Sequence, residues 1–182
     1  MTPSGCPPRS ESMPGAFLSS EEYDEQAHKL YNQGDYDGAL EMLKEGLSLY
    51  PHAVELYVGL GYARLARDEF AWARHAFEQA VALDGHHEDA LVGLGETLLR
   101  FGHRDAALRC FRKVQALGFE DDVELMLTMG RALYREGLYG DSRDVFARAC
   151  SSRPDSAEAA ASLGYALHRL GDEVGAGRQV RR

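Results

Sequence analysis

The sequence predicts an all-α solenoid, in which antiparallel helix hairpins stack in a row. Three observations lead to this fold class: a unit of 34 or 35 residues returns along the chain, both halves of the unit carry apolar residues at helical spacing, and a glycine or aspartate separates the halves. A period of this length is the signature of a repeat architecture. One hairpin buries too little apolar surface to offset the entropy of ordering it, so neighbouring hairpins must pack together.

Turn positions set the period of the repeat. Gly34, Asp68, Gly102, Gly137 and Gly171 follow one another at intervals of 34, 34, 35 and 34 residues. Glycine at these positions allows the positive backbone angle that ends a helix. Small residues stand seven positions before the turns, namely Ala27, Gly61, Gly95, Gly130 and Gly164. Large apolar residues, expected to fill the space between hairpins, stand nine positions after them, namely Leu43, Phe77, Phe111, Phe146 and Val180.

The individual helices follow from this alignment, two to a unit. Ser19 and Glu22 form a capping-box pattern before the first helix. Pro51 and Pro154 close two of the units, because proline does not continue a helix. In the 35-residue interval Phe119 replaces this proline, so we expect the junction of the third and fourth units to bend differently. The expected helices are 20–33 and 36–49, 54–67 and 70–83, 88–101 and 104–117, 122–136 and 139–151, and 157–170 and 173 onward.

The unit, with its small residues, its phenylalanine and its closing proline, resembles the tetratricopeptide repeat. This resemblance covers about residues 20–182 and implies a right-handed superhelix whose concave groove is lined by the first helix of each unit. Residues 1–18, rich in proline and serine, are expected to form a disordered arm before a repeat domain at 19–182. Its units are 20–53, 54–87, 88–122, 123–156 and an incomplete 157–182, which lacks the polar capping helix common in the family.

Composition disfavours several classes of function. A net charge of −9 argues against nucleic-acid binding, which usually needs a basic face, and no apolar run approaches the roughly 20 residues of a membrane helix. Cys6, Cys110 and Cys150 fit neither a disulfide framework nor a zinc pattern. The adjacent His86 and His87 are interpreted as a polar link between units. Without a recognisable catalytic set or phosphate-binding loop, we expect no enzyme activity, no cofactor and no metal.

By the resemblance, positions 2, 5, 9 and 12 of each unit lie on the inner face, since these spacings share one side of a helix. The first unit places Glu21, Asp24, His28 and Tyr31 there, so its inner face is acidic. Asp24, His28 and Asp89 stand where chaperone-binding members of the family carry lysine and asparagine, and that role is not expected. The predicted partner-binding residues are Tyr31, Val58, Tyr62, Leu65, Val92, Leu99, Arg100, Leu127, Arg131, Tyr134, Arg135, Tyr165 and Arg169.

These residues predict an apolar and aromatic groove with arginines toward its C-terminal half. In the alternative interpretation, the apolar residues pack between adjacent first helices and the arginines form a solvated face. For Trp72, in the second helix of its unit, we expect packing between neighbouring units.

Such a groove predicts a non-enzymatic protein-binding scaffold for a peptide or helix of another protein, with the arginines meeting acidic residues of that partner. Two alternatives stay open: a bacterial secretion-type chaperone, and a scaffold that self-assembles through the uncapped final hairpin. With no export signal, a cytoplasmic location is expected, and alanine, arginine and glycine usage suggests a bacterial source.

Overall fold

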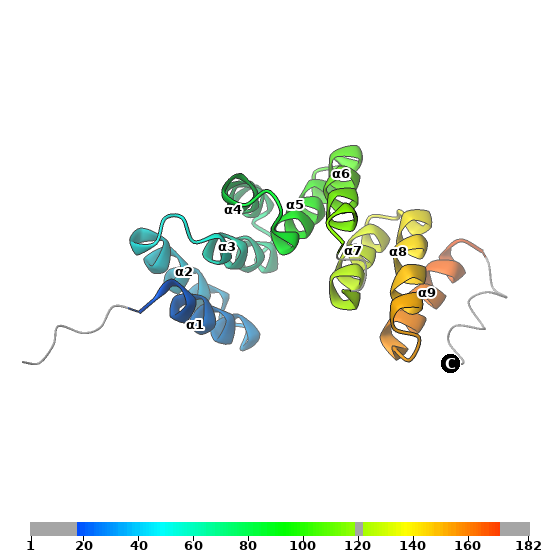
Figure 1. Ribbon diagram of the computed structural model, residues 1–182, viewed down its shortest axis with the longest axis horizontal. Helices are drawn as coiled ribbons and strands as arrows, with labels where there is room; N and C mark the ends of the chain where they lie inside the picture. The colour runs from blue at the N-terminus through cyan, green and yellow to red at the C-terminus, as the bar shows by residue number, and fades with distance from the viewer. Residues whose placement is uncertain (1–17, 119–121, 172–182) are drawn as a thin grey trace, which may run out of the picture.

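The computed structural model describes residues 18–118 and 122–171, and every regular element in these ranges is a helix. Figure 1 shows the helices following one another along the long axis of the molecule. They are α1 (Ser20–Asn32), α2 (Tyr36–Leu49), α3 (Val54–Ala66), α4 (Phe70–Leu83), α5 (Glu88–Arg100), α6 (Arg104–Ala116), α7 (Val123–Arg135), α8 (Tyr139–Ser152) and α9 (Ala157–Arg169). All bounds lie within one residue of those expected, which confirms the predicted solenoid of helix hairpins. The predicted arm, apart from Leu18, and the helix expected from 173 onward lie outside the described residues.

Local sequence signals begin and end these helices as expected. The Ser19 backbone N–H donates to Glu22 Oε2 at 2.7 Å, and the Glu22 N–H donates to Ser19 Oγ at 3.2 Å, which completes the predicted capping box of α1. Between the helices of each hairpin, the turn glycines have φ from 73° to 81°. Asp68 takes the same place in the second hairpin with φ 58°. Aspartate tolerates this left-handed region better than most residues do.

The core is organised around the large residue of each second helix. Phe77 is fully buried between Gly61 of α3 and Gly93 of α5, and a Cβ on either glycine would meet its ring within 3 Å. Phe111 and Phe146 stand against Gly95 and Gly130, in the first helices of their own hairpins. Small residues at these positions therefore let the first helices approach the ring closely. The contact of Phe77 with Gly93 of the next unit confirms for this residue that it fills the space between hairpins.

The row of hairpins is curved, with the odd-numbered helices on the inside. Helices α1, α3, α5 and α7 each contact the next odd-numbered helix, whereas the described even-numbered helices have no comparably extensive contacts with one another. Elements on the inner side of a curved row lie closer together than those on its outer side. The inner-face positions inferred from the repeat are therefore positions of α1, α3, α5, α7 and α9.

The junction between α6 and α7 differs from the other junctions. The backbones of α6 and α7 approach one another less closely than those of the equivalent pairs α2/α3, α4/α5 and α8/α9. Helix α6 ends in a helical Leu117 followed by Gly118 with φ 88°, whereas α2, α4 and α8 end in a residue with ψ between 69° and 101°, outside the helical region. The expected difference at this junction is thus present at the end of α6, while Phe119 itself lies outside the described residues.

Candidate partner-binding groove

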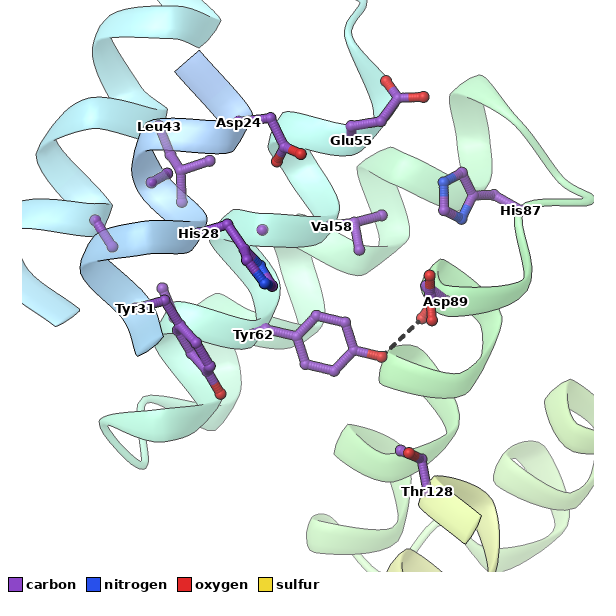
Figure 2. Close-up of a pocket in the computed structure, with 14 residues that line it drawn as sticks. Asp24, His28, Tyr31, Leu43, Glu55, Val58, Tyr62, His87, Asp89 and Thr128 are labelled. Carbon is purple, nitrogen blue, oxygen red and sulfur yellow. Dashed lines mark hydrogen bonds between the residues drawn. The ribbon is translucent and has the colours of Figure 1, made fainter. Parts of the chain in front are cut away.

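A cavity of about 480 Å³ opens on the inner face of the N-terminal half. Its lining comes from four consecutive odd-numbered helices, with a floor from α2. Figure 2 shows the ring of Tyr62 reaching across the cavity toward Asp89, with Asp24, His28 and Glu55 around it. The residues that line it are Asp24, Ala27, His28, Tyr31, Ala39, Leu43, Glu55, Val58, Gly59, Tyr62, Ala63, His87, Asp89 and Thr128. Of the predicted binding residues, Tyr31, Val58 and Tyr62 line this cavity.

Most of the apolar residues predicted for the groove are buried. The exposed fraction is 8% for Val58, 0% for Val92, 4% for Leu99 and 0% for Leu127. Leu65 is half-buried against the cluster that contains Phe77. The prediction that these side chains form an exposed apolar surface is therefore wrong, because they belong to buried clusters that include residues of neighbouring helices. Their burial agrees with the alternative interpretation, in which they pack between helices.

The tyrosines of the inner face differ from one another in burial and in the residues they contact. Tyr31 and Tyr134 are half-buried, and each packs its ring on the first aromatic residue of the following helix, Tyr36 at 5.3 Å and Tyr139 at 5.1 Å between ring centroids. Tyr62 packs edge-on against Phe77 at 5.1 Å and donates its hydroxyl to the backbone oxygen of Asp89 at 3.3 Å. Tyr165, 62% exposed, is the most accessible of these side chains.

Each inner-face arginine has a partner within the chain. Arg100 Nη1 lies 3.4 Å from Glu136 Oε1, and Arg131 Nη1 lies 2.6 Å from Glu158 Oε1. Arg135 pairs with Glu96. Arg169 donates to the Tyr139 hydroxyl at 2.6 Å, and its guanidinium carbon lies 4.8 Å from the centre of that ring. These contacts run from one repeat to the next, so the arginines link neighbouring units across the C-terminal half of the inner face.

Three inner-face carboxylates of the N-terminal half have no such partner among the described residues. No ion pair there involves Asp24, Glu55 or Asp89, which lie on α1, α3 and α5. Burial raises the pKa of the Asp24 carboxyl, with a further rise from Glu55 and an opposing effect of His28. Burial likewise raises the pKa of Asp89, against the opposing effect of His87. The pKa values of Tyr31 and Tyr62 are also raised, chiefly by burial.

Sequence reasoning placed Asp24, Glu55 and Asp89 on the inner face but did not select them as binding residues. The paired carboxylates can be recognised in the sequence by their distance from an arginine. Glu96, Glu136 and Glu158 stand 27 to 39 residues from an arginine, about one repeat, and each pairs with it. No arginine or lysine lines the cavity that holds Asp24, Glu55 and Asp89.

His86, His87 and Trp72 make contacts within the chain. The backbone N–H of His86 donates to Asp84 Oδ1 at 2.8 Å, and His87 Nδ1 accepts from the Ala90 N–H at the start of α5. Across the described ranges, no group of three or more metal-ligating side chains is placed to hold an ion. Trp72 is 64% exposed with the Arg64 guanidinium over its ring, so the expectation that it packs between units is wrong.

None of the described helices combines the length and the apolar character that crossing a bilayer requires.

Solved structures of similar fold are repeat proteins of the same kind. MamA 41-end from Desulfovibrio magneticus RS-1 superposes with a TM-score of 0.67 at 20% identity, covering 89% of this chain and 91% of that one. YrrB, described as a TPR protein with an unusual peptide-binding site, superposes with a TM-score of 0.59 at 22% identity, covering 88% and 82%. At these identities the likeness concerns the fold.

Two curated relatives share part of the sequence. Protein bimA of Emericella nidulans is 30% identical over 95 residues, which are 52% of this chain and 12% of that protein. Anaphase-promoting complex subunit 3 of Schizosaccharomyces pombe is 25% identical over 118 residues, 65% of this chain and 18% of that protein. The chain thus spans less than a fifth of the length of either relative.

A family model agrees with the repeat period and the paired helices described above. The tetratricopeptide repeat model matches residues 25–88, 60–121, 92–157 and 127–182 in overlapping windows, which together cover most of the chain. The chain therefore belongs to the tetratricopeptide repeat family.

Proposed function

We propose that this protein is a non-enzymatic scaffold that holds a segment of a partner protein in the cavity on its inner face. Tetratricopeptide repeats are generally protein-interaction modules, and this supports the class. The observation that carries the proposal is the cavity itself. Its volume of about 480 Å³ is within the range of ligand sites, and Tyr31 and Tyr62 contribute aromatic walls. The peptide-binding site named for YrrB supports the same class of ligand.

The size of the cavity suggests an extended occupant. Residues of α1, α3, α5 and α7 contribute to its lining. Adjacent packed helices lie about 8–10 Å apart, so four helices span roughly 25–30 Å. About eight extended residues cover that distance. A peptide of this length can therefore contact all four helices at once.

Site-specific photo-crosslinking tests this location. Replacing His28 with p-benzoylphenylalanine puts a photoreactive ring inside the cavity, and the same replacement of the exposed Trp72 puts one on α4, outside it. On irradiation in native extract, we expect a discrete crosslinked partner from position 28 and none from position 72. Equal crosslinking at both positions, or crosslinking only at 72, would contradict the proposal.

The same experiment separates the alternatives. A secretion-type chaperone would crosslink to one aggregation-prone client, and a self-assembling scaffold would crosslink to a second copy of the chain. The contact of acidic partner residues with Arg100, Arg131 and Arg135 stays a prediction. Such a partner would have to displace the glutamates that already pair with these arginines, namely Glu136, Glu158 and Glu96. The cytoplasmic location and the bacterial source also stay predictions.

A further inference from the structure

The inner face divides into a half whose carboxylates are paired and a half whose carboxylates are not. In the C-terminal half, Glu96, Glu136 and Glu158 each pair with an arginine of a neighbouring unit. Glu124 lies 3.8 Å from Arg153. Around the cavity, within the described residues, Asp24, Glu55 and Asp89 have no ion-pair partner. The C-terminal half thus repeats the pairing of a carboxylate with an arginine of the adjacent unit. At the cavity the carboxylates are present, but no arginine pairs with them.

The cavity does not supply its own positive charge. Its lining contains no lysine or arginine, and the basic groups there are His28 and His87. At the edge of the lining, Arg131 donates to Thr128 Oγ1 at 3.2 Å and pairs with Glu158. The site therefore presents three carboxylates over an apolar floor of Leu43, Val58 and Ala63.

Neighbouring carboxylates and partial burial make this arrangement costly when the cavity is empty. Burial is the main cause of the raised pKa values of Asp24 and Asp89, with a further rise from Glu55 and Glu25 at Asp24 and from Glu88 and Asp122 at Asp89. A cation placed among these groups would offset this cost and would give the carboxylates the kind of partner that those of the C-terminal half already have.

Aromatic side chains favour a guanidinium over an ammonium group. Tyr31 and Tyr62 line the cavity, and a planar guanidinium can stack on a ring while binding a carboxylate with two parallel hydrogen bonds. A lysine ammonium is a compact point charge without this geometry. The chain itself places a guanidinium over an aromatic ring three times, with Arg169 over Tyr139 at 4.8 Å, Arg100 over Phe70 at 5.3 Å and Arg64 over Trp72 at 5.8 Å.

We propose that the partner segment inserts an arginine side chain into this cavity, between the carboxylates of Asp24, Glu55 and Asp89 and against the rings of Tyr31 and Tyr62. This inference rests on the proposed function and names the chemistry of the segment that the cavity receives. It reverses the charge that the sequence predicted for the partner, because the arginines of the inner face are already paired.

Four pools of biotinylated nonapeptides test the proposal on the full chain. The central residue is arginine, citrulline, lysine or glutamate, and all other positions are mixed. Citrulline keeps the shape of arginine without its charge. We expect the arginine pool to bind at least about fivefold more tightly than the citrulline and glutamate pools, and more tightly than the lysine pool, as measured by biolayer interferometry.

Matched variants locate the preference. In Asp24→Asn/Glu55→Gln/Asp89→Asn, the advantage of the arginine pool over the citrulline pool should fall to within about twofold. The control Glu41→Gln/Asp105→Asn/Asp155→Asn removes the same charge at exposed positions outside the cavity and should keep the preference. Circular dichroism checks that both variants are folded, and Glu55→Gln alone, at an exposed position, gives the same test with a smaller effect.

The outcomes distinguish this inference from the proposed function. If all pools bind and neither the pool nor the triple variant changes the affinity, the arginine inference is wrong while the groove still binds peptides. If the preference survives in the cavity variant and disappears in the control, the inference is also wrong. If no pool binds and position 28 gives no crosslink, both proposals fail together.

Discussion

The ring of Phe77 lies against the backbone of Gly93 so closely that a Cβ on Gly93 would come within 3 Å of three ring atoms. Phe77 belongs to the second helix of one unit and Gly93 to the first helix of the next. Their contact is therefore a junction between hairpins, the kind of contact that gives a repeat protein its stability.

Alanine at Gly93 should destabilise the fold although alanine is the better helix former. We expect Gly93→Ala to lower the free energy of unfolding by about 1–3 kcal/mol, because the buried ring cannot move aside without strain. Gly140→Ala is the matched control, since a Cβ there meets nothing within 4 Å, and it should be stabilising by about 0.5 kcal/mol. Urea unfolding followed by circular dichroism measures both, and equal effects at the two positions would refute the packing argument.

Asp68 is the position where the repeat tolerates strain. It is the non-glycine residue with positive φ in the described ranges, in a turn where the other hairpins have glycine. Asp68→Gly should therefore raise the free energy of unfolding by about 0.5 kcal/mol. The reverse exchange, Gly102→Asp, should lower it by a similar amount, and thermal unfolding of the two variants checks the opposite signs.

Leu99 is buried and Tyr165 is exposed, although both were predicted to face a partner. Leu99→Asp should cost about 3–5 kcal/mol, because it leaves an uncompensated charge between α5 and its neighbours. Tyr165→Asp should change stability by no more than about 0.5 kcal/mol. Chemical denaturation measures the free energy of unfolding of both variants. A folded and stable Leu99→Asp variant would mean that the Leu99 side chain is accessible to solvent.

Asp24 should make stability depend on pH in a defined direction. Burial and the charges of Glu25 on α1 and Glu55 on α3 raise its pKa in the folded protein, His28 on α1 opposes them, and the side chains of α2 at the cavity, Ala39 and Leu43, carry no charge. A raised pKa in the folded state means that the stabilising contribution is present below the unfolded pKa of about 3.9 and is lost as the pH rises through the folded value.

At pH 7 the ionised Asp24 therefore costs stability, and Asp24→Asn should raise the melting temperature. The difference between the two proteins should shrink toward pH 4, where Asp24 is increasingly protonated. Asp105→Asn, at an exposed position outside the cavity, serves as the control. A lower melting temperature for Asp24→Asn at pH 7 would show that its carboxylate is stabilised by the fold.

Helix bounds and the core could be predicted closely from the repeat. Turn glycines, the Ser19 cap and the phenylalanines each have one local consequence, and self-comparison aligned the turn position in five units. The exposure of Val92, Leu99 and Leu127 could not be predicted in this way. Helical spacing tells which side of a helix faces inward, whereas exposure depends on how closely two helices approach, and Gly93 reduces that distance. The arginine pairs were also missed, because they join residues about one repeat apart rather than neighbours on one helix.

Where described helices make extensive contacts, the two helices are neighbours or next-but-one neighbours along the chain. During synthesis, a hairpin can therefore dock on the one before it soon after both have left the ribosome, without waiting for distant sequence. For the same reason, duplication or loss of one whole 34-residue unit would lengthen or shorten the row and leave the remaining junctions intact. In evolution, such a chain can change its reach in steps of one hairpin while it keeps the acidic cavity near its N-terminal end.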